Sequence, residues 1–313
     1  MIESGVNVSG DAEEPARSWK MTGQGRFHVS APFAGYFPTS EFAKYDDFIK
    51  LAGETIKQDA RTHVVLARRR AAEGADMTSC AFIIKCYRYP FLPRLRTGFR
   101  ISKSENEFNN LHQLKQLGVN AVEPVAYGTE RTRLGFVRSC FVITRYLEET
   151  ITLADWHWAN HDEEQSMQKA ERFIRLGAIF NRLHNARFFL FTAKPRNILL
   201  RPSSDSDSSL HILDTPYARR LRWDPLERWA QGRDLGYCLG SFHPKVTSAE
   251  LEAFYQGYLP DPLGGLTTGI QRRIARAIRV QQNLTPVARL VNTLKLYLKQ
   301  RRRWRRARRV LSR

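Results

Sequence analysis

The order of apolar patterns along the chain restricts its fold more than any other feature of the sequence. Strand-like runs precede residue 147 and cover residues 55–59, 62–70, 80–88, 121–129 and 135–147. One helical pattern, at residues 104–117, stands between the third and fourth of these runs. The sequence therefore predicts a β-rich lobe of five strands with a single helix.

The pattern becomes helical after Leu147. Residues 165–185 have helical spacing, a loop and a strand hairpin follow around the Ser/Asp-rich turn at 203–209, and the chain is helical again from about residue 225. We therefore expect an α+β, bilobal fold with a small β-rich N-lobe and a larger helical C-lobe. The expected parts are a loosely ordered extension at 1–45, the N-lobe at 46–147, the C-lobe at 148–285 and a basic helical tail at 286–313.

The helix at 104–117 carries recognisable end signals. Ser104 is expected as its N-cap, and Glu107, three residues later, would complete a capping box. Gly118 ends the helix. In this interpretation Glu107 has a structural role, which stands against the catalytic role considered below.

The basic charge of the chain is concentrated at its C-terminal end. The formal net charge is +19, yet no acidic residue follows Asp261, and residues 262–313 carry 15 lysines and arginines. Such a block indicates an anionic partner: phosphorylated lipid, polysaccharide or nucleic acid. The four cysteines are scattered without metal-ligand spacing, so we expect reduced thiols in a cytosolic protein. We also expect neither a secretory signal nor a spanning helix.

The tail combines an apolar stripe with an arginine cluster. Thr285 and Pro286 resemble an N-cap and N1 pair, and the stripe that follows is expected to pack on the helical lobe. Trp304 then lies among eight arginines within residues 301–313, which suits the interface of an anionic bilayer. A nucleic-acid backbone would fit nearly as well, and a merely solvated end is the third interpretation.

Four polar or charged residues stand at or next to the predicted elements, in an order that suggests a shared site. Lys85 ends the apolar run AFIIK, Glu107 lies on the next helix, Asn197 closes the segment KPRN and Asp214 follows in ILD. In kinases a lysine holds the α/β-phosphates, a glutamate aims that lysine, and Asn and Asp oxygens bind Mg²⁺. The arrangement resembles the protein-kinase-like superfamily, which implies ATP and Mg²⁺ as cofactors and Lys194 near the γ-phosphate.

Within that superfamily, four segments resemble the lipopolysaccharide core kinases, the heptose kinase and Kdo kinase family. The segments are YDDFIKLAGETIKQDARTHVV, NEFNNLHQLKQLGVNAVEPVAYG, NRLHNARFFLFTAKPRNILL and RDLGYCLGSF. The resemblance covers residues 45–260 and implies an ATP-dependent kinase of an inner-core sugar, peripheral at the cytoplasmic face of the inner membrane. Its acceptor would be an anionic glycolipid, held by the arginine-rich loop 88–100 and the tail, with residues 300–313 at the membrane surface. Nucleic acid is disfavoured as a partner.

The predicted catalytic loop departs from the kinase pattern. The general form is H-R-D-x-x-x-x-N, and counting back from Asn197 places Thr192 at the aspartate position and Leu190 at the histidine position. A threonine hydroxyl is not a base at neutral pH, and general-base help is worth roughly 10²–10⁴-fold. Asp205 or Asp207 of the neighbouring turn would have to replace it. The alternative function is therefore a pseudokinase that binds nucleotide or glycolipid as a scaffold in lipopolysaccharide biogenesis.

Each candidate residue also has a structural interpretation. A lysine at a strand end is often a surface residue, and Asn197 and Asp214 are residue types common in turns. Asp214 is moreover followed by Thr-Pro rather than Phe-Gly. His184 is expected to be packed at its helix end, and Asp234 to hydrogen-bond the backbone of the catalytic loop. The sequence alone leaves both an active kinase and a pseudokinase open.

Overall fold

The computed structural model describes most of the chain before residue 260 and a short helical stretch after it. The described residues are 20–22, 25–71, 79–95, 97–98, 100–159, 166–201, 210–222, 224–242, 245–259, 271–272 and 274–278. The chain divides into two compact units: unit 1 comprises Met1–Glu148 with Thr215–Tyr217, and unit 2 comprises Glu149–Asp214 with Ala218–Arg313. The predicted turn at 203–209 and the tail at 286–313 lie outside the described residues.

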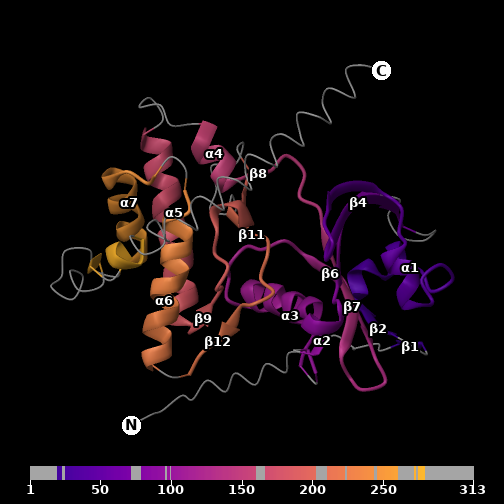
Figure 1. Ribbon diagram of the computed structural model, residues 1–313. Coiled ribbons are helices and arrows are strands. Elements are labelled where there is room, and N and C mark those ends of the chain that lie inside the picture. Colours follow the sequence, from indigo (N-terminus) through magenta and orange to yellow (C-terminus); the bar gives the residue numbers. More distant parts are fainter. Residues whose placement is uncertain are drawn as a thin grey trace, which may run out of the picture. The chain divides into compact units, whose positions relative to one another are not determined.

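Unit 1 is built on an antiparallel sheet that has seven strands within the described residues (Figure 1). In sheet order these are β1 (Lys20–Thr22), β2 (Gly25–Val29), β6 (Pro124–Arg131), β7 (Val137–Arg145), β5 (Ser79–Arg88), β4 (Thr62–Arg70) and β3 (Glu54–Gln58). Between β5 and β6 the chain forms α2 (Phe91–Leu95) and the longer α3 (Lys103–Gln116). The five predicted strands are present as β3 to β7, and β1 and β2 are additional.

Residues 25–49 are ordered, which differs from the loose extension expected over residues 1–45. After β2 come the 3₁₀-helix η1 (Ala31–Tyr36) and helix α1 (Tyr45–Ile49). Phenylalanines from this segment enter the core of unit 1, namely Phe27, Phe33, Phe37, Phe42 and Phe48. The ring of Phe48 stacks on that of Phe141, with centroids 5.0 Å apart. Because isolated aromatics among Gly, Ser and Pro show no period, the sequence pattern did not reveal this core segment.

The N-cap of helix α3 lies two residues earlier than predicted. Its N-cap is Ser102, whose Oγ accepts a hydrogen bond from the Glu105 N–H at 3.2 Å. Ser104 lies inside the first turn, is fully buried and donates its hydroxyl to the Gly128 carbonyl at 3.1 Å. The capping box predicted for Ser104 and Glu107 is therefore wrong, and the Glu107 carboxylate serves other partners.

Unit 2 is mainly helical, as predicted. Its helices are α4 (Leu153–Ala159), α5 (Ser166–Asn185), η3 (Pro195–Asn197), α6 (Asp224–Leu239) and α7 (Ser248–Tyr258). Its strands are β8 (Ile151–Thr152), β9 (Phe188–Phe189), β10 (Ile198–Leu200), β11 (Leu210–Ile212) and β12 (Arg219–Arg220). Strands β10 and β11 are the predicted hairpin, and β8 adds to it. Across the described part of the chain, none of the helices has both the length and the apolar character needed to cross a membrane.

Helices α5 and α7 approach each other closely. A Cβ atom on either Gly177 or Gly257 would overlap a carbonyl oxygen of the opposite helix, so glycine is required at both positions for this spacing. The side chain of Asn181 donates to the Tyr258 carbonyl at 2.8 Å, and His184 Nδ1 lies 2.9 Å from the Tyr258 hydroxyl. These contacts fix the end of α5, which leads directly into the predicted catalytic loop.

Candidate active site

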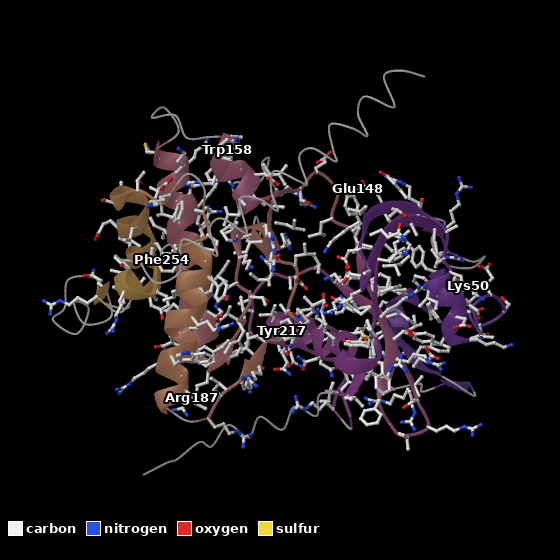
Figure 2. The ribbon with its side chains drawn as sticks, in the orientation of Figure 1. Lys50, Glu148, Trp158, Arg187, Tyr217 and Phe254 are labelled. Carbon is white, nitrogen blue, oxygen red and sulfur yellow. The ribbon has the colours of Figure 1, made fainter. Side chains whose placement is uncertain are left out.

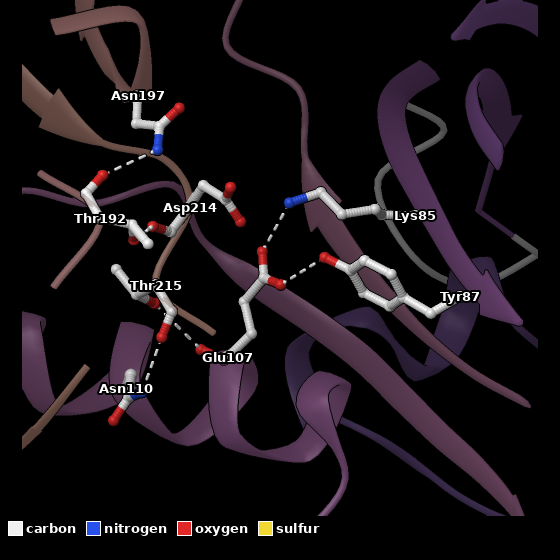
Figure 3. Close-up of polar contacts among 8 residues, drawn as sticks. All are labelled: Lys85, Tyr87, Glu107, Asn110, Thr192, Asn197, Asp214 and Thr215. Atoms are coloured by element: carbon white, nitrogen blue, oxygen red, sulfur yellow. Dashed lines mark hydrogen bonds and ion pairs between the residues drawn. The ribbon is translucent and has the colours of Figure 1, made fainter. Parts of the chain in front are cut away.

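Lys85 and Glu107 form a buried ion pair in unit 1. The Lys85 ammonium lies 2.8 Å from Glu107 Oε1, and the two side chains are 16% and 1% exposed. The Tyr87 hydroxyl donates to the other carboxylate oxygen of Glu107 at 3.0 Å (Figure 3). Two donors thus fix both oxygens of one carboxylate, which in turn fixes the position of the lysine ammonium.

The strand geometry explains why these two donors meet one carboxylate. Lys85 and Tyr87 are two residues apart on β5, so their side chains project from the same face of the strand. That face meets α3, which supplies Glu107. Tyr87 was not singled out from the sequence, although the period of two along the strand was a signal that could have found it.

Helix α3 also binds the segment that follows Asp214. The Asn110 side-chain amide donates to the Thr215 carbonyl at 2.7 Å, and Asn106 donates to the Pro216 carbonyl at 2.8 Å (Figure 3 for Asn110). The two asparagines are one helical turn apart and flank Glu107. Sequence analysis missed both. Asparagine is a poor helix former, so the three in α3, at positions 106, 109 and 110, were a signal, but it does not separate these two from the exposed Asn109.

In unit 2, Thr192 and Asn197 are joined through the main chain of the predicted catalytic loop. Asn197 Nδ2 donates to the Thr192 carbonyl at 2.9 Å (Figure 3), so the amide oxygen of Asn197 is the atom that remains to act as a ligand. The Thr192 hydroxyl lies 3.2 Å from the Asp214 carbonyl and 3.4 Å from the Leu190 carbonyl. Its single proton is therefore directed to the backbone, and it has no acceptor role toward these partners.

Asp214 lies directly after the β10–β11 hairpin. The N–H of the preceding residue, Leu213, donates to the Asn197 carbonyl at 2.9 Å. Together with the Thr192 contact, this bond ties the chain at Asp214 to the catalytic loop within unit 2. The structure therefore brings Thr192, Asn197 and Asp214 together, whereas Lys85 and Glu107 form their own cluster in unit 1.

The loop backbone is held by Asp234 of α6, as predicted. The fully buried carboxylate of Asp234 accepts the N–H groups of Leu190 at 2.7 Å and Phe191 at 2.6 Å. Phe191 has a φ of 57°, in the left-handed region that is costly for a bulky residue. His184 is buried against Phe189, as expected of a packed helix-end histidine, and its Nε2 lies 3.6 Å from Asp234.

Lys194 lies in the same loop, two residues after Thr192. Its ammonium lies 5.5 Å from the centre of the Tyr237 ring, a cation–π distance. Partial burial and then the nearby Arg196 lower the pKa of Lys194 below its ordinary value of 10.5. A cation with weakened solvation and no acidic neighbour in the loop is suited to binding an anion.

The loop itself offers no carboxylate. Residues 188–200 contain neither Asp nor Glu, and the described ranges contain no group of three or more His, Cys, Asp or Glu residues arranged to hold a metal. The candidates for a replacement base, Asp205 and Asp207, lie outside the described residues. Within the described loop, the oxygen donors for a cation come from Asn197 and Asp214.

Comparisons with known proteins bear on the family and the fold of the chain. The model of the lipopolysaccharide kinase (Kdo/WaaP) family matches residues 82–258, which is more than half of the chain. The lipopolysaccharide core heptose(I) kinase WaaP of Escherichia coli is 25% identical over 178 residues, 56% of this chain and 66% of that protein. The match thus spans slightly less than two thirds of that relative's length.

A solved structure is similar in fold. It is described as WaaP in complex with acyl carrier protein, and it superposes with a TM-score of 0.59 and 17% sequence identity. The superposition covers 82% of this chain and 99% of that chain. The fold of the chain is therefore the α+β protein-kinase-like fold.

Proposed function

We propose, from the premise that the chain belongs to the lipopolysaccharide kinase (Kdo/WaaP) family, that it transfers a phosphoryl group from ATP to a sugar hydroxyl of the lipopolysaccharide inner core. The acceptor class is a heptose or Kdo residue. The observation that carries the proposal is the buried pair of Lys85 and Glu107, because it presents a lysine in a fixed position.

The burial of Glu107 supports a functional role for this pair. A carboxylate that is 1% exposed loses its hydration, and buried ion pairs often stabilise a fold no better than apolar residues of similar size. Their retention is explained when one partner has a ligand to bind. We assign Lys85 to the α/β-phosphates of ATP and Glu107, supported by Tyr87, to the orientation of Lys85.

The residues of unit 2 fit a magnesium ion. Hard oxygen donors suit Mg²⁺, and the hydrogen bond from Asn197 Nδ2 to Thr192 directs the amide nitrogen away from the ligand position. Asn197 and Asp214 would therefore hold the ion, which neutralises phosphate charge when bound. Lys194 would contact the γ-phosphate.

The geometry of Thr192 limits the rate we expect. Its hydroxyl is directed to a backbone carbonyl, so it does not accept the proton of the attacking sugar hydroxyl. The remaining contribution of this chain is the positioning of phosphates by Lys85 and Lys194. Since positioning and charge neutralisation carry most of phosphoryl transfer, we propose a slow kinase.

A pseudokinase is the second candidate, and the loop sequence favours it. With no carboxylate in residues 188–200, the site would bind nucleotide or glycolipid without turnover and act as a scaffold in lipopolysaccharide biogenesis. The deciding experiment incubates the purified chain with labelled ATP, Mg²⁺ and lipopolysaccharide. If the wild-type protein labels lipopolysaccharide and the Lys85→Ala variant does not, the protein is a kinase. If it binds Mg·ATP but transfers no label, it is a pseudokinase.

We also propose that the protein works at the cytoplasmic face of the inner membrane, bound peripherally through residues 300–313. The support is the cluster of eight arginines with Trp304, since each basic residue contributes about 1 kcal/mol at an anionic surface. Deletion of residues 300–313 should release the protein from anionic vesicles. Continued sedimentation of the truncated protein would exclude the tail as the anchor.

A further inference from the structure

Large apolar side chains are exposed on two loops of unit 1. Phe91 and Leu95, one turn apart on α2, are 68% and 51% exposed, and Ile101, just before α3, is 63% exposed. Leu134, in the turn between β6 and β7, is 72% exposed. A single exposed apolar residue is ordinary, but a group of them on adjoining segments marks an interaction surface.

The two loops are fastened to each other. The Val137 N–H donates to the Thr97 hydroxyl at 2.9 Å, and the Arg131 guanidinium donates to the Arg100 carbonyl at 2.7 Å. The same guanidinium donates to the Gly135 carbonyl at 2.8 Å. Figure 1 shows α2 beside the end of the β6–β7 hairpin. The described residues of 88–101 (88–95, 97–98 and 100–101) and residues 131–138 thus form one surface, here called the amphipathic patch.

The charge of the amphipathic patch is positive. Residues 88–101 and 131–138 contain no Asp or Glu. Arg88, Arg100 and Arg133 of these segments are exposed. The acidic residue directly before residue 131 is Glu130. It pairs with Arg138 at 3.0 Å. The patch therefore presents exposed apolar side chains and exposed arginines on the same two segments.

This combination fits the surface of an anionic bilayer. Arginines bind lipid phosphates while Phe, Leu and Ile enter the boundary between headgroups and acyl chains. The β6–β7 turn is closed tightly by the Gly135 N–H bonding the Thr132 carbonyl at 2.9 Å, so Leu134 projects from a hairpin end. Projecting apolar residues enter a fluid layer, whereas an acidic protein would need matching pockets for each of them.

We propose that the amphipathic patch docks unit 1 on an anionic membrane and inserts Phe91 and Leu134 into it. The patch and the tail are different segments of the sequence, so the chain would hold the membrane through two segments. The inference extends the membrane association of the proposed function, but it requires no phosphotransfer.

The test measures partitioning of the full-length protein onto vesicles of phosphatidylglycerol and phosphatidylcholine. The double variant Phe91→Ser/Leu134→Ser should bind on the order of tenfold more weakly, since partial burial of two such side chains is worth at least that factor. The double variant Arg100→Gln/Arg133→Gln should weaken binding by a similar factor. That factor should become smaller at high salt, because salt screens the attraction that the arginines provide. Ile56→Ser is the matched control, because Ile56 is 54% exposed on β3 outside the patch.

Insertion itself is read from tryptophan quenching by brominated acyl chains. Leu134→Trp should add quenching relative to the wild-type protein, and Ile56→Trp should add none. The inference is overturned if the double variant partitions like the wild type, as it would if the patch served an acidic protein, or if Leu134→Trp is not quenched. Loss of vesicle binding on deletion of residues 300–313, with no effect of the patch variants, overturns the patch but leaves membrane association intact. Transfer of labelled phosphate by the patch variants to detergent-dispersed lipopolysaccharide reports on the kinase separately.

Discussion

The cluster around Lys85 in unit 1 and the loop 188–200 in unit 2 use charge in opposite ways. In unit 1 the charges belong to the side chains assigned to the ligand, with Glu107 buried beneath Lys85. In unit 2 the loop lacks acidic residues, and the buried carboxylate, Asp234, holds the backbone from behind. The buried carboxylate of unit 1 thus fixes a charged side chain, whereas the buried carboxylate of unit 2 fixes the backbone of a loop.

The difference shows that the backbone path of the loop is held by bonds from Asn197 and Asp234, which do not use the side chain at the predicted base position. Asn197 bonds the Thr192 carbonyl and Asp234 bonds two backbone N–H groups, and neither interaction involves the side chain of residue 192. These bonds that hold the loop backbone therefore do not depend on which side chain stands at position 192. Substitutions in the two regions should accordingly affect different measurable quantities.

The largest effect is expected from removal of the lysine in unit 1. Lys85→Ala should abolish the rise in melting temperature that Mg·ATP gives, a stabilisation of about 2.7 kcal/mol at a hundredfold excess over Kd. Asp214→Ala should do the same. Lys57→Ala is the control, because Lys57 lies on β3, is 61% exposed and pairs with Asp59 at 3.2 Å. An unchanged shift in both Lys85→Ala and Asp214→Ala would contradict the site assignment.

The next effect tests whether the loop lacks only its base. Thr192→Asp should raise phosphotransfer on the order of 10²-fold, since the bonds from Asn197 and Asp234 to the loop backbone do not use this side chain. The Leu213 N–H bond to the Asn197 carbonyl would still join the chain at Asp214 to the loop once the Thr192 hydroxyl contact is lost. The assay is labelled ATP with lipopolysaccharide, with Thr192→Asn as the isosteric control. A fall in existing activity would mean that another base operates. No activity in either form, together with intact ATP binding, would favour the pseudokinase.

A smaller effect is expected where α3 binds the segment after Asp214. Asn110→Ala removes the donor to the Thr215 carbonyl and should lower the free energy of unfolding by about 1–3 kcal/mol. Asn109→Ala, an exposed position on the same helix, is the control and should change it little. If both variants unfold at the same urea concentration, the contact contributes nothing to stability.

The smallest effect is expected on the pH dependence of stability, through the Glu250 carboxylate of α7 in unit 2. Burial raises the pKa of Glu250, but hydrogen bonds from His157 and the Thr247 N–H outweigh it and hold the pKa below 4.5. Because the folded pKa is depressed, this stabilisation is present above pH 4.5 and is lost as the pH falls toward the folded value. The stability gap between wild type and Glu250→Gln should therefore shrink below pH 4.5. Glu252→Gln, exposed on the same helix, should show no such change.

Much of the fold was predictable because its signals are periodic. Strands β3 to β7 and helices α3 and α5 follow alternating or helical apolar patterns. The aromatic segment at 25–49 has no period, and its burial depends on contacts with distant strands. The start of α3 was misplaced because two serines stand close together, and only the hydrogen bond from Glu105 identifies Ser102 as the cap.

The residues of the candidate site that could be proposed from the sequence are those whose spacing matches a known motif. Lys85, Asn197, Asp214 and Asp234 stand at recognisable positions along the chain. Asn106 and Asn110 were missed because their partners, Thr215 and Pro216, are more than a hundred residues away in sequence. No local pattern specifies which backbone carbonyl a helix asparagine will meet.

The backbone grip of Asp234 has a consequence for substitutions in the loop. Its two hydrogen bonds reach the N–H groups of residues 190 and 191, which every amino acid except proline supplies. The carboxylate therefore fixes the path of the backbone without reading the side chains of these two residues. Those side chains are constrained separately, because Leu190 and Phe191 are both buried, so a substitution at either position should be limited by packing space rather than by the bonds to Asp234.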